Sequence, residues 1–157
     1  MRKDMKNKVA LLLGSESDRH LIDPSLEYYD YFDIDLDVKI LSAHRNPKEV
    51  AEFAKNARFQ NYKVLIGGAG MAAHLAGALK AHSTLPVIGL PFPGGINDGI
   101  DSLLSTVQMP KGVPVATMAV GTAGAINAAV LCAEIFAIFD EEVHEKLIQF
   151  KNNGCKI

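Results

Sequence analysis

Three short segments of the sequence combine glycine with hydroxyl, carboxylate, imidazole and guanidinium groups. The first is Gly-Ser-Glu-Ser-Asp at 14–18, the second is Ser-Ala-His-Arg-Asn-Pro at 42–47, and the third is Gly-Gly-Ala-Gly-Met-Ala-Ala-His-Leu at 67–75. Each follows an apolar or alternating run that is typical of a β-strand. Because ligands of open α/β sheets bind beyond the carboxyl ends of the strands, we expect the three segments to form one site.

The first segment suits an anion such as phosphate. Gly14 lets the backbone approach a ligand, and the hydroxyls of Ser15 and Ser17, with free N–H groups, can bind phosphate oxygens. Asp18 can accept hydrogen bonds from ribose hydroxyls. An alternative is that Ser15 or Ser17 simply caps the following helix. Since the pattern is neither GxGxxG nor a Walker loop, a dinucleotide or a triphosphate is not indicated.

The other two segments add a cation and two histidines. Arg45, beside an expected helix start, is suited to clamp a phosphate. His44 next to it can exchange a proton near neutral pH. His74 is a second acid–base candidate, although a histidine on a helix surface would give the same pattern. The glycines of the third segment allow backbone to approach a flat ligand, and its alanines leave room for that ligand.

The remaining histidines and the cysteines carry no comparable signal. His20, His82 and His144 fall in expected helices and are predicted to be solvated. No set of Cys, His and Asp has the spacing of metal ligands, so no metal is predicted. Cys132 lies in an apolar run and is expected to be a core thiol.

The elements that must position the segments alternate between strand and helix. Strands are predicted at 9–13, 34–40, 63–67, 85–90 and 114–120, and helices at about 17–32, 47 onward, 71–81, 101–107, 122–139 and 140 onward. Pro24 is expected to split the first helix, and Asn46 with Glu49 to cap the second. The alternation predicts a doubly wound α/β fold, a parallel sheet with helices on both faces.

Composition excludes several classes of protein. The 157 residues include 16 Lys and Arg against 18 Asp and Glu, so there is no positive excess for binding nucleic acid. Hydrophobic residues at 48% exclude disorder, and two cysteines without a disulfide framework favour a reducing compartment. Glycine and alanine concentrate in 67–137, where charges are few. This block is therefore either the centre of the domain or covered by other subunits, and 122–139 is expected to be a helix buried on nearly all sides rather than a membrane span.

Together the segments resemble a known family, the N5-carboxyaminoimidazole ribonucleotide mutases of bacterial purine synthesis. The similar ranges are 14–18, 42–45 with Pro47, 68–75, 101–105, 107–110 and 112–117, with Asn127, inside a stretch from about Val9 to Ile138. The family usually has Gly where Met71 stands and Pro where Ala76 stands.

The resemblance implies a flavodoxin-like, three-layer α/β/α domain that forms a cytoplasmic homo-octamer without metal or organic cofactor. The implied reaction moves a carboxyl group from N5 to C4 of the ribonucleotide through transient CO2. It implies that His44 and His74 are catalytic, with His44 as general acid and base. The residues it implies for substrate binding are Gly14, Ser15, Ser17, Asp18, Ser42, Ala43, Arg45, Gly68, Ala69, Gly70, Met71, Ala72 and Leu75.

Residues 1–157 are expected to form a single domain, with 1–7 as a flexible N-terminus and 140–157 as a helix that packs on a neighbouring subunit. Two other functions stay open. One is a carboxylase that uses free CO2 and aminoimidazole ribonucleotide, although that branch commonly lacks the second histidine. The other is a non-catalytic module that binds a nucleoside monophosphate.

Overall fold

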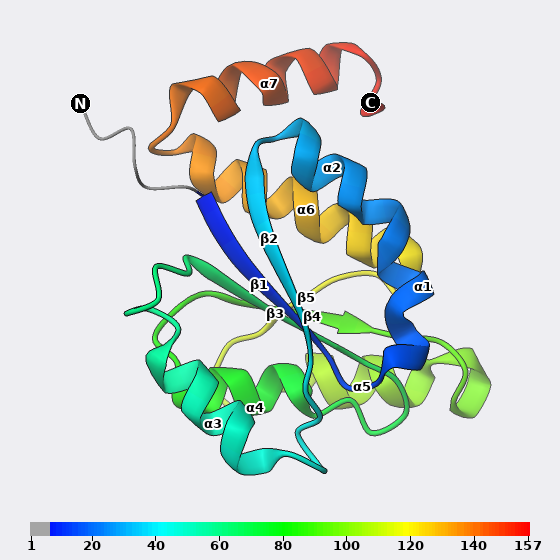
Figure 1. Cartoon of the computed structure of the whole chain (residues 1–157). Coiled ribbons are helices and arrows are strands. Elements are labelled where there is room, and N and C mark those ends of the chain that lie inside the picture. The colour runs from blue at the N-terminus through cyan, green and yellow to red at the C-terminus, as the bar shows by residue number, and fades with distance from the viewer. Residues whose placement is uncertain (1–6) are drawn as a thin grey trace.

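Five parallel strands form the middle layer of the structure, a computed structural model that describes residues 7–157 (Figure 1). In the order β2-β1-β3-β4-β5, they are β2 (Ile34–Ile40), β1 (Asn7–Leu13), β3 (Val64–Ala69), β4 (Val87–Pro91) and β5 (Ala116–Thr117). The register places Leu13 beside both Ile40 and Gly68. The polar segments that follow these three strands therefore start at the same edge of the sheet. The predicted α/β class is confirmed.

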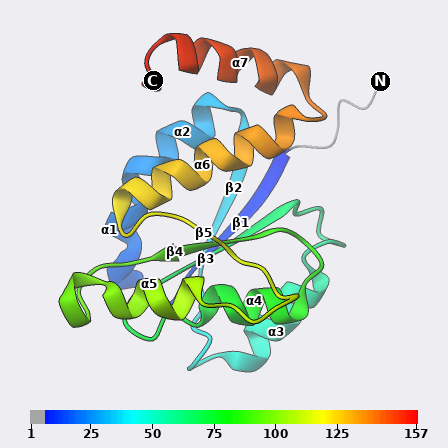
Figure 2. The same ribbon diagram turned by 180° about the vertical axis from the view of Figure 1, so that it is seen from behind.

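Helices cover both faces of the sheet (Figure 2). One face carries α1 (Arg19–Ile22), α2 (Leu26–Tyr31) and α6 (Thr122–Ala137), and the other carries α3 (Pro47–Asn56), α4 (Leu75–His82) and α5 (Ile100–Val107). Pro24 splits the first predicted helix, because the 3-10 turn η2 (Asp23–Ser25) separates α1 from α2. Two further 3-10 turns, η1 (Glu16–Asp18) and η3 (Ile96–Asp98), follow β1 and β4.

The strands match their sequence patterns, with one exception. Val9 to Leu13 are fully buried, as a parallel strand covered on both faces should be. The alternating strand β2 lies at the sheet edge, as predicted. The strand expected at 114–120 is only two residues long. Its first residue, Pro114, has no N–H to donate, and Met118 adds one bond, from its N–H to the Gly89 carbonyl at 2.9 Å.

Helix α3 begins as predicted, with Asn46 as its N-cap residue and Pro47 as its first residue. The Asn46 side chain, however, makes no cap hydrogen bond; its Oδ1 accepts a hydrogen bond from the Ser42 N–H at 3.3 Å. The prediction for α6 is wrong. Helix α6 is not buried on nearly all sides in the single chain. It buries a stripe of small residues, whereas Ala123, Asn127 and Glu134 are exposed. Within residues 7–157, no helix is long and apolar enough to cross a membrane.

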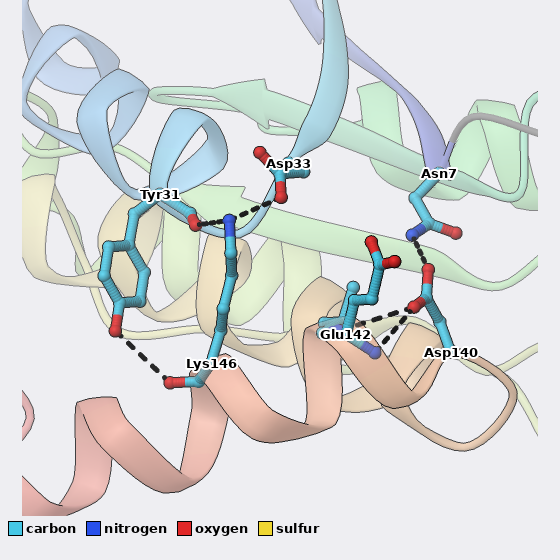
Figure 3. Close-up of polar contacts among 7 residues, drawn as sticks. Asn7, Tyr31, Asp33, Asp140, Glu142 and Lys146 are labelled. Atoms are coloured by element: carbon cyan, nitrogen blue, oxygen red, sulfur yellow. Dashed lines mark hydrogen bonds and ion pairs between the residues drawn. The ribbon is translucent and has the colours of Figure 1, made fainter.

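Helix α7 (Glu141–Asn152) packs on its own chain, over α6 and α2 (Figure 1). Figure 3 shows the polar contacts that fasten it. The Asn7 amide donates to the Asp140 carboxylate at 2.8 Å, so Asn7 belongs to β1 and not to a flexible terminus. Lys146 donates to the Tyr31 carbonyl at 2.8 Å and pairs with Asp33. The apolar face predicted for this helix, Val143, Leu147 and Phe150, is buried as expected. Residues 1–6 lie outside the described residues.

Candidate active site

The three polar segments meet where the sheet changes winding direction. β1 lies between β2 and β3, and the helices that follow β1 and β3 cover opposite faces of the sheet. The Gly14 N–H donates to the Gly68 carbonyl at 3.1 Å, which fastens the first segment to the third. This is the switch point at which doubly wound sheets bind ligands.

Two histidines from different segments form a hydrogen-bonded pair. The Nε2 atom of His44 lies 2.8 Å from Nδ1 of His74, and the rings are nearly perpendicular, at 84°. One nitrogen must donate and the other accept, so the pair shares at least one proton along this bond. Both rings are exposed, which leaves them accessible to a substrate. The sequence proposed each histidine separately, and the structure joins them.

The loop that carries His74 is held by α5. The Ser105 hydroxyl accepts from the Ala73 N–H at 3.0 Å and donates to the Asp101 carbonyl at 2.7 Å. It also lies 3.4 Å from the Met71 carbonyl. These contacts tie the loop to a helix about 30 residues away along the chain. Residues 101–105 are one of the ranges that resemble the family described above, but no role for Ser105 followed from the sequence.

The helix predicted at 71–81 begins only at Leu75. Met71 has φ of +53°, in the left-handed region, so the chain cannot continue as an α-helix there. The segment from Met71 to His74 is therefore a loop, and His74 is the residue that precedes α4. Met71 is 68% exposed beside the site.

The first segment is ordered by short-range bonds. The Ser15 hydroxyl accepts from the Ser17 N–H at 3.3 Å, so the capping role that we considered for Ser15 is confirmed. The two hydroxyls also lie 2.8 Å apart. Burial raises the pKa of Asp18, while the Ser17 hydrogen bond and the nearby His20 ring lower it. His20 contacts this segment directly, since its Nδ1 lies 2.8 Å from the Ser17 carbonyl.

The second segment forms a tight turn around Arg45. The Arg45 N–H donates to the Ser42 hydroxyl at 3.3 Å, and Asn46 holds the Ser42 N–H from the other side. The Arg45 side chain is exposed, whereas Ser42 and Ala43 are half-buried. Arg45 therefore lies in a turn fixed by hydrogen bonds, directly after His44 in the chain, with its side chain open to solvent.

Two glycines of the third segment are explained by protein packing rather than by a flat ligand. A Cβ added at Gly67 would lie 2.7 Å from the Ala76 nitrogen, and one at Gly68 would lie 2.7 Å from the Phe92 ring. A Cβ at Gly70 would meet only ordinary contacts, starting at 3.7 Å. Of the three, only Gly70 has space beside it.

The predicted binding residue Leu75 needs a correction. Its side chain is 2% exposed and packs in the core between α3, α4 and the sheet, so only its backbone can reach a ligand. By contrast, Ala72 is exposed, and Ala69 and Gly70 are half-buried at the end of β3. The accessible part of this segment is therefore Ala69 to Ala72 and His74.

A hollow among the described residues lies away from the three segments. It has a volume of about 820 Å³ and lies between β2 and the α1–α2 region, with Arg19, Tyr29 and Asp33 among its lining residues. None of the site residues named above lines it. In the single chain the candidate site is an exposed surface at the sheet edge rather than an enclosed cavity.

Comparison with known proteins gives a consistent result. The AIR carboxylase family model matches residues 8–156. The chain is 45% identical over 149 residues to the N5-carboxyaminoimidazole ribonucleotide mutase of Bacillus subtilis (strain 168), which covers 95% of this chain and 92% of the relative. It is 44% identical over 140 residues to the enzyme of the same name from Escherichia coli (strain K12), covering 89% and 83%.

Solved structures agree with the sequence relatives. The crystal structure of Treponema denticola PurE superposes with a TM-score of 0.84 at 26% identity, covering 94% of this chain and 90% of that one. A type II dehydroquinase from Propionibacterium acnes, at 14% identity and a TM-score of 0.53, shares the fold alone. The family model spans nearly the whole chain, and the curated relatives are covered over most of their length. The chain belongs to the AIR carboxylase family.

Proposed function

We propose that this protein converts N5-carboxyaminoimidazole ribonucleotide to 4-carboxy-5-aminoimidazole ribonucleotide in purine biosynthesis, as an isomerase. The observation that carries the proposal is the His44–His74 pair, 2.8 Å apart at the switch point of the sheet. The names of relatives at 43–45% identity support the same activity. The pair also favours a mutase over the direct carboxylase, in which the second histidine is commonly missing.

The proposed reaction needs one proton, which His44 donates to the substrate and later takes back. A protonated His44 donates to N5 as the N5–carboxyl bond breaks, which yields CO2 and the free amine. The electron-rich C4 then attacks CO2 and forms the new C–C bond. The proton on C4 finally returns to the imidazole, and the ring regains its aromaticity. The imidazole can act as acid and as base in turn, and the bond to His74 lets the pair share the proton.

The ribose phosphate end of the substrate is assigned to the first two segments. Arg45 supplies an exposed guanidinium for the phosphate, and the Ser15 and Ser17 hydroxyls supply further donors. Asp18 accepts from ribose hydroxyls. This arrangement leaves the aminoimidazole ring facing His44, His74 and the Ala69–Ala72 backbone. The proposed step uses one proton, which the enzyme recovers, and the CO2 that the substrate itself releases. It therefore involves no organic cofactor.

Subunit association would complete the site. Transient CO2 must be recaptured before it diffuses away, which requires a closed site, yet in the single chain both histidines and Met71 are exposed. Ile96, Ile100 and Leu104 also present an exposed apolar stripe on and before α5. Such a stripe is typical of a surface that another subunit covers. We therefore include in the proposal that the protein forms the expected homo-octamer and acts in the cytoplasm.

Packing of α7 on a neighbouring subunit also stays a prediction. The inner face of α7 is already occupied by its own chain, so that contact would have to use the outer face, where Ile148 is 48% exposed. The chain would then act as one mutase domain over residues 1–157.

The test supplies purified protein with N5-carboxyaminoimidazole ribonucleotide in bicarbonate-free buffer. We expect the C4-carboxylated product. Turnover only with aminoimidazole ribonucleotide and added CO2 would assign the direct carboxylase instead. Binding of the ribonucleotide without turnover under either condition would assign a binding module.

A further inference from the structure

His20 contacts the predicted phosphate-binding segment, although its place in an expected helix predicted that it would be solvated. Its Nδ1 atom lies 2.8 Å from the carbonyl oxygen of Ser17. A carbonyl only accepts hydrogen bonds, so Nδ1 must carry the hydrogen. This bond holds the imidazole of His20, an exposed residue, in one orientation.

The bond from His20 is important because Ser17 is hydrogen-bonded through both of its peptide groups in this turn. On its amino side, the Ser17 N–H donates to the Ser15 hydroxyl at 3.3 Å. On its carboxyl side, the Ser17 carbonyl accepts from His20. The two bonds together fix both peptide groups that flank Ser17. Its hydroxyl lies 2.8 Å from that of Ser15 and 3.5 Å from the Asp18 carboxylate, so all three polar groups are placed by this turn.

Two backbone bonds also hold the turn, one from the Asp18 N–H to the Ser15 carbonyl at 3.2 Å and one from the Arg19 N–H to the Glu16 carbonyl. η1 is only three residues long, and none of its residues is buried. The Asp18 carboxylate is close enough for the His20 ring to lower its pKa, and Arg19 pairs with Asp23 at 3.6 Å along α1. The His20 bond adds to these backbone bonds and holds the Ser17 carbonyl at the carboxyl side of this exposed turn.

We propose that His20 is a positioning residue for the ribose phosphate end of the substrate: its Nδ1–H, bonded to the Ser17 carbonyl, holds the Ser15 and Ser17 hydroxyls and the Asp18 carboxylate in their binding arrangement. The inference rests on the binding role proposed above for this segment. It predicts that His20 affects substrate affinity and leaves the chemical step unchanged.

Two isosteric replacements separate positioning from direct contact with the substrate. An asparagine amide can place its N–H where Nδ1 lies, whereas the longer glutamine amide lies where Nε2 lies. His20→Ala is expected to raise the KM for the ribonucleotide by about 2- to 12-fold, the range for one net hydrogen bond, with kcat unchanged. His20→Asn is expected to restore the KM of the unmodified protein, and His20→Gln to resemble His20→Ala.

The matched control is His82→Ala, an exposed histidine at the end of α4, which should leave both KM and kcat unchanged. An unchanged KM in His20→Ala would overturn the proposal, and so would rescue by glutamine but not by asparagine, since that pattern means direct contact through Nε2.

Failure of the proposed function would look different. If the unmodified protein turned nothing over, the mutase assignment would fail, and the same variants would be compared by calorimetric titration with aminoimidazole ribonucleotide. Weaker binding by His20→Ala and His20→Gln than by the unmodified protein and His20→Asn would then support the positioning role independently of the reaction. Equal affinities would overturn it.

Discussion

The loops that follow β1 and β3 lie side by side but are held in different ways. In the first loop, the side-chain bonds of Ser15, Ser17 and His20 join residues no more than three positions apart. In the third, Ser105 of α5 reaches back 32 residues to the Ala73 N–H. The proposed phosphate end is thus built locally, and the histidine end depends on the packed domain. Changes in the first loop should alter binding with little cost in stability, whereas changes behind the third should alter both.

The largest effect should come from the histidine end. His44→Asn removes the group that gives and regains the proton but leaves the first loop intact. We expect kcat to fall by about 10²- to 10⁴-fold, the usual contribution of general acid–base catalysis. Ribonucleotide affinity, measured by calorimetry, should stay within twofold of the unmodified protein, roughly 0.4 kcal/mol. Normal turnover would show that His44 is not the acid and base.

The next largest effect should come from the phosphate end. Arg45→Ala removes a charge-assisted hydrogen bond, and we expect KM to rise by roughly 10- to 100-fold while kcat is retained. Steady-state kinetics at two salt concentrations provide the measurement, because the contribution of an exposed charge weakens as salt is added. Arg58, exposed beyond the end of α3, offers the control, and Arg58→Ala should leave KM unchanged. An unchanged KM in Arg45→Ala would exclude the phosphate role.

Ser105→Ala tests the long-range support of the third loop. It leaves the buried Ala73 N–H without its partner, which costs about 1–3 kcal/mol of unfolding free energy. We expect kcat to fall as well, because His74 loses its fixed position, while KM changes less. Urea unfolding and kinetics measure the two effects, with exposed Thr84→Ala as the control, expected within about 0.5 kcal/mol. A stable variant with full kcat would mean that α5 does not position His74.

The smallest effect should come from Met71. Its φ of +53° strains a residue with a Cβ, and glycine, the residue usual in the family at this position, adopts it freely. We expect Met71→Gly to raise the unfolding free energy by up to about 1 kcal/mol, since relief of left-handed strain exceeds the entropy cost of glycine. The urea midpoint measures it. Ala72→Gly, one residue further along the same loop and without positive φ, should instead destabilise the protein.

The same contrast explains how much could be predicted from the sequence. Short-range signals were sufficient for the strand–helix alternation, the split at Pro24, the edge position of β2 and the cap at Ser15. The His44–His74 bond could not be predicted, because it joins residues 30 positions apart whose loops meet only after the sheet forms.

Other features depend on packing that no local pattern encodes. The late start of α4 follows from the backbone at Met71, and the truncated β5 follows from the Pro114 stretch that precedes it. The glycine pattern suggested ligand contact, whereas Gly67 and Gly68 are required by the close approach of Ala76 and Phe92. His20 was missed because a lone polar histidine on a helix gives no sign of which carbonyl it will contact.

The fastening of α7 has a consequence for the order in which the chain can fold. Asp140 bonds to Asn7, 133 positions earlier, and Lys146 bonds to Tyr31, 115 positions earlier. Phe150 completes an aromatic cluster with Tyr28, Tyr31 and Phe32. Contacts of such long range form late, because most of the chain must already be arranged before they can close. During synthesis, the sides of Tyr28, Tyr31 and Phe32 that face Phe150 therefore stay uncovered until residues 141–152 have emerged, whereas the contacts of α2 with α6 can form earlier.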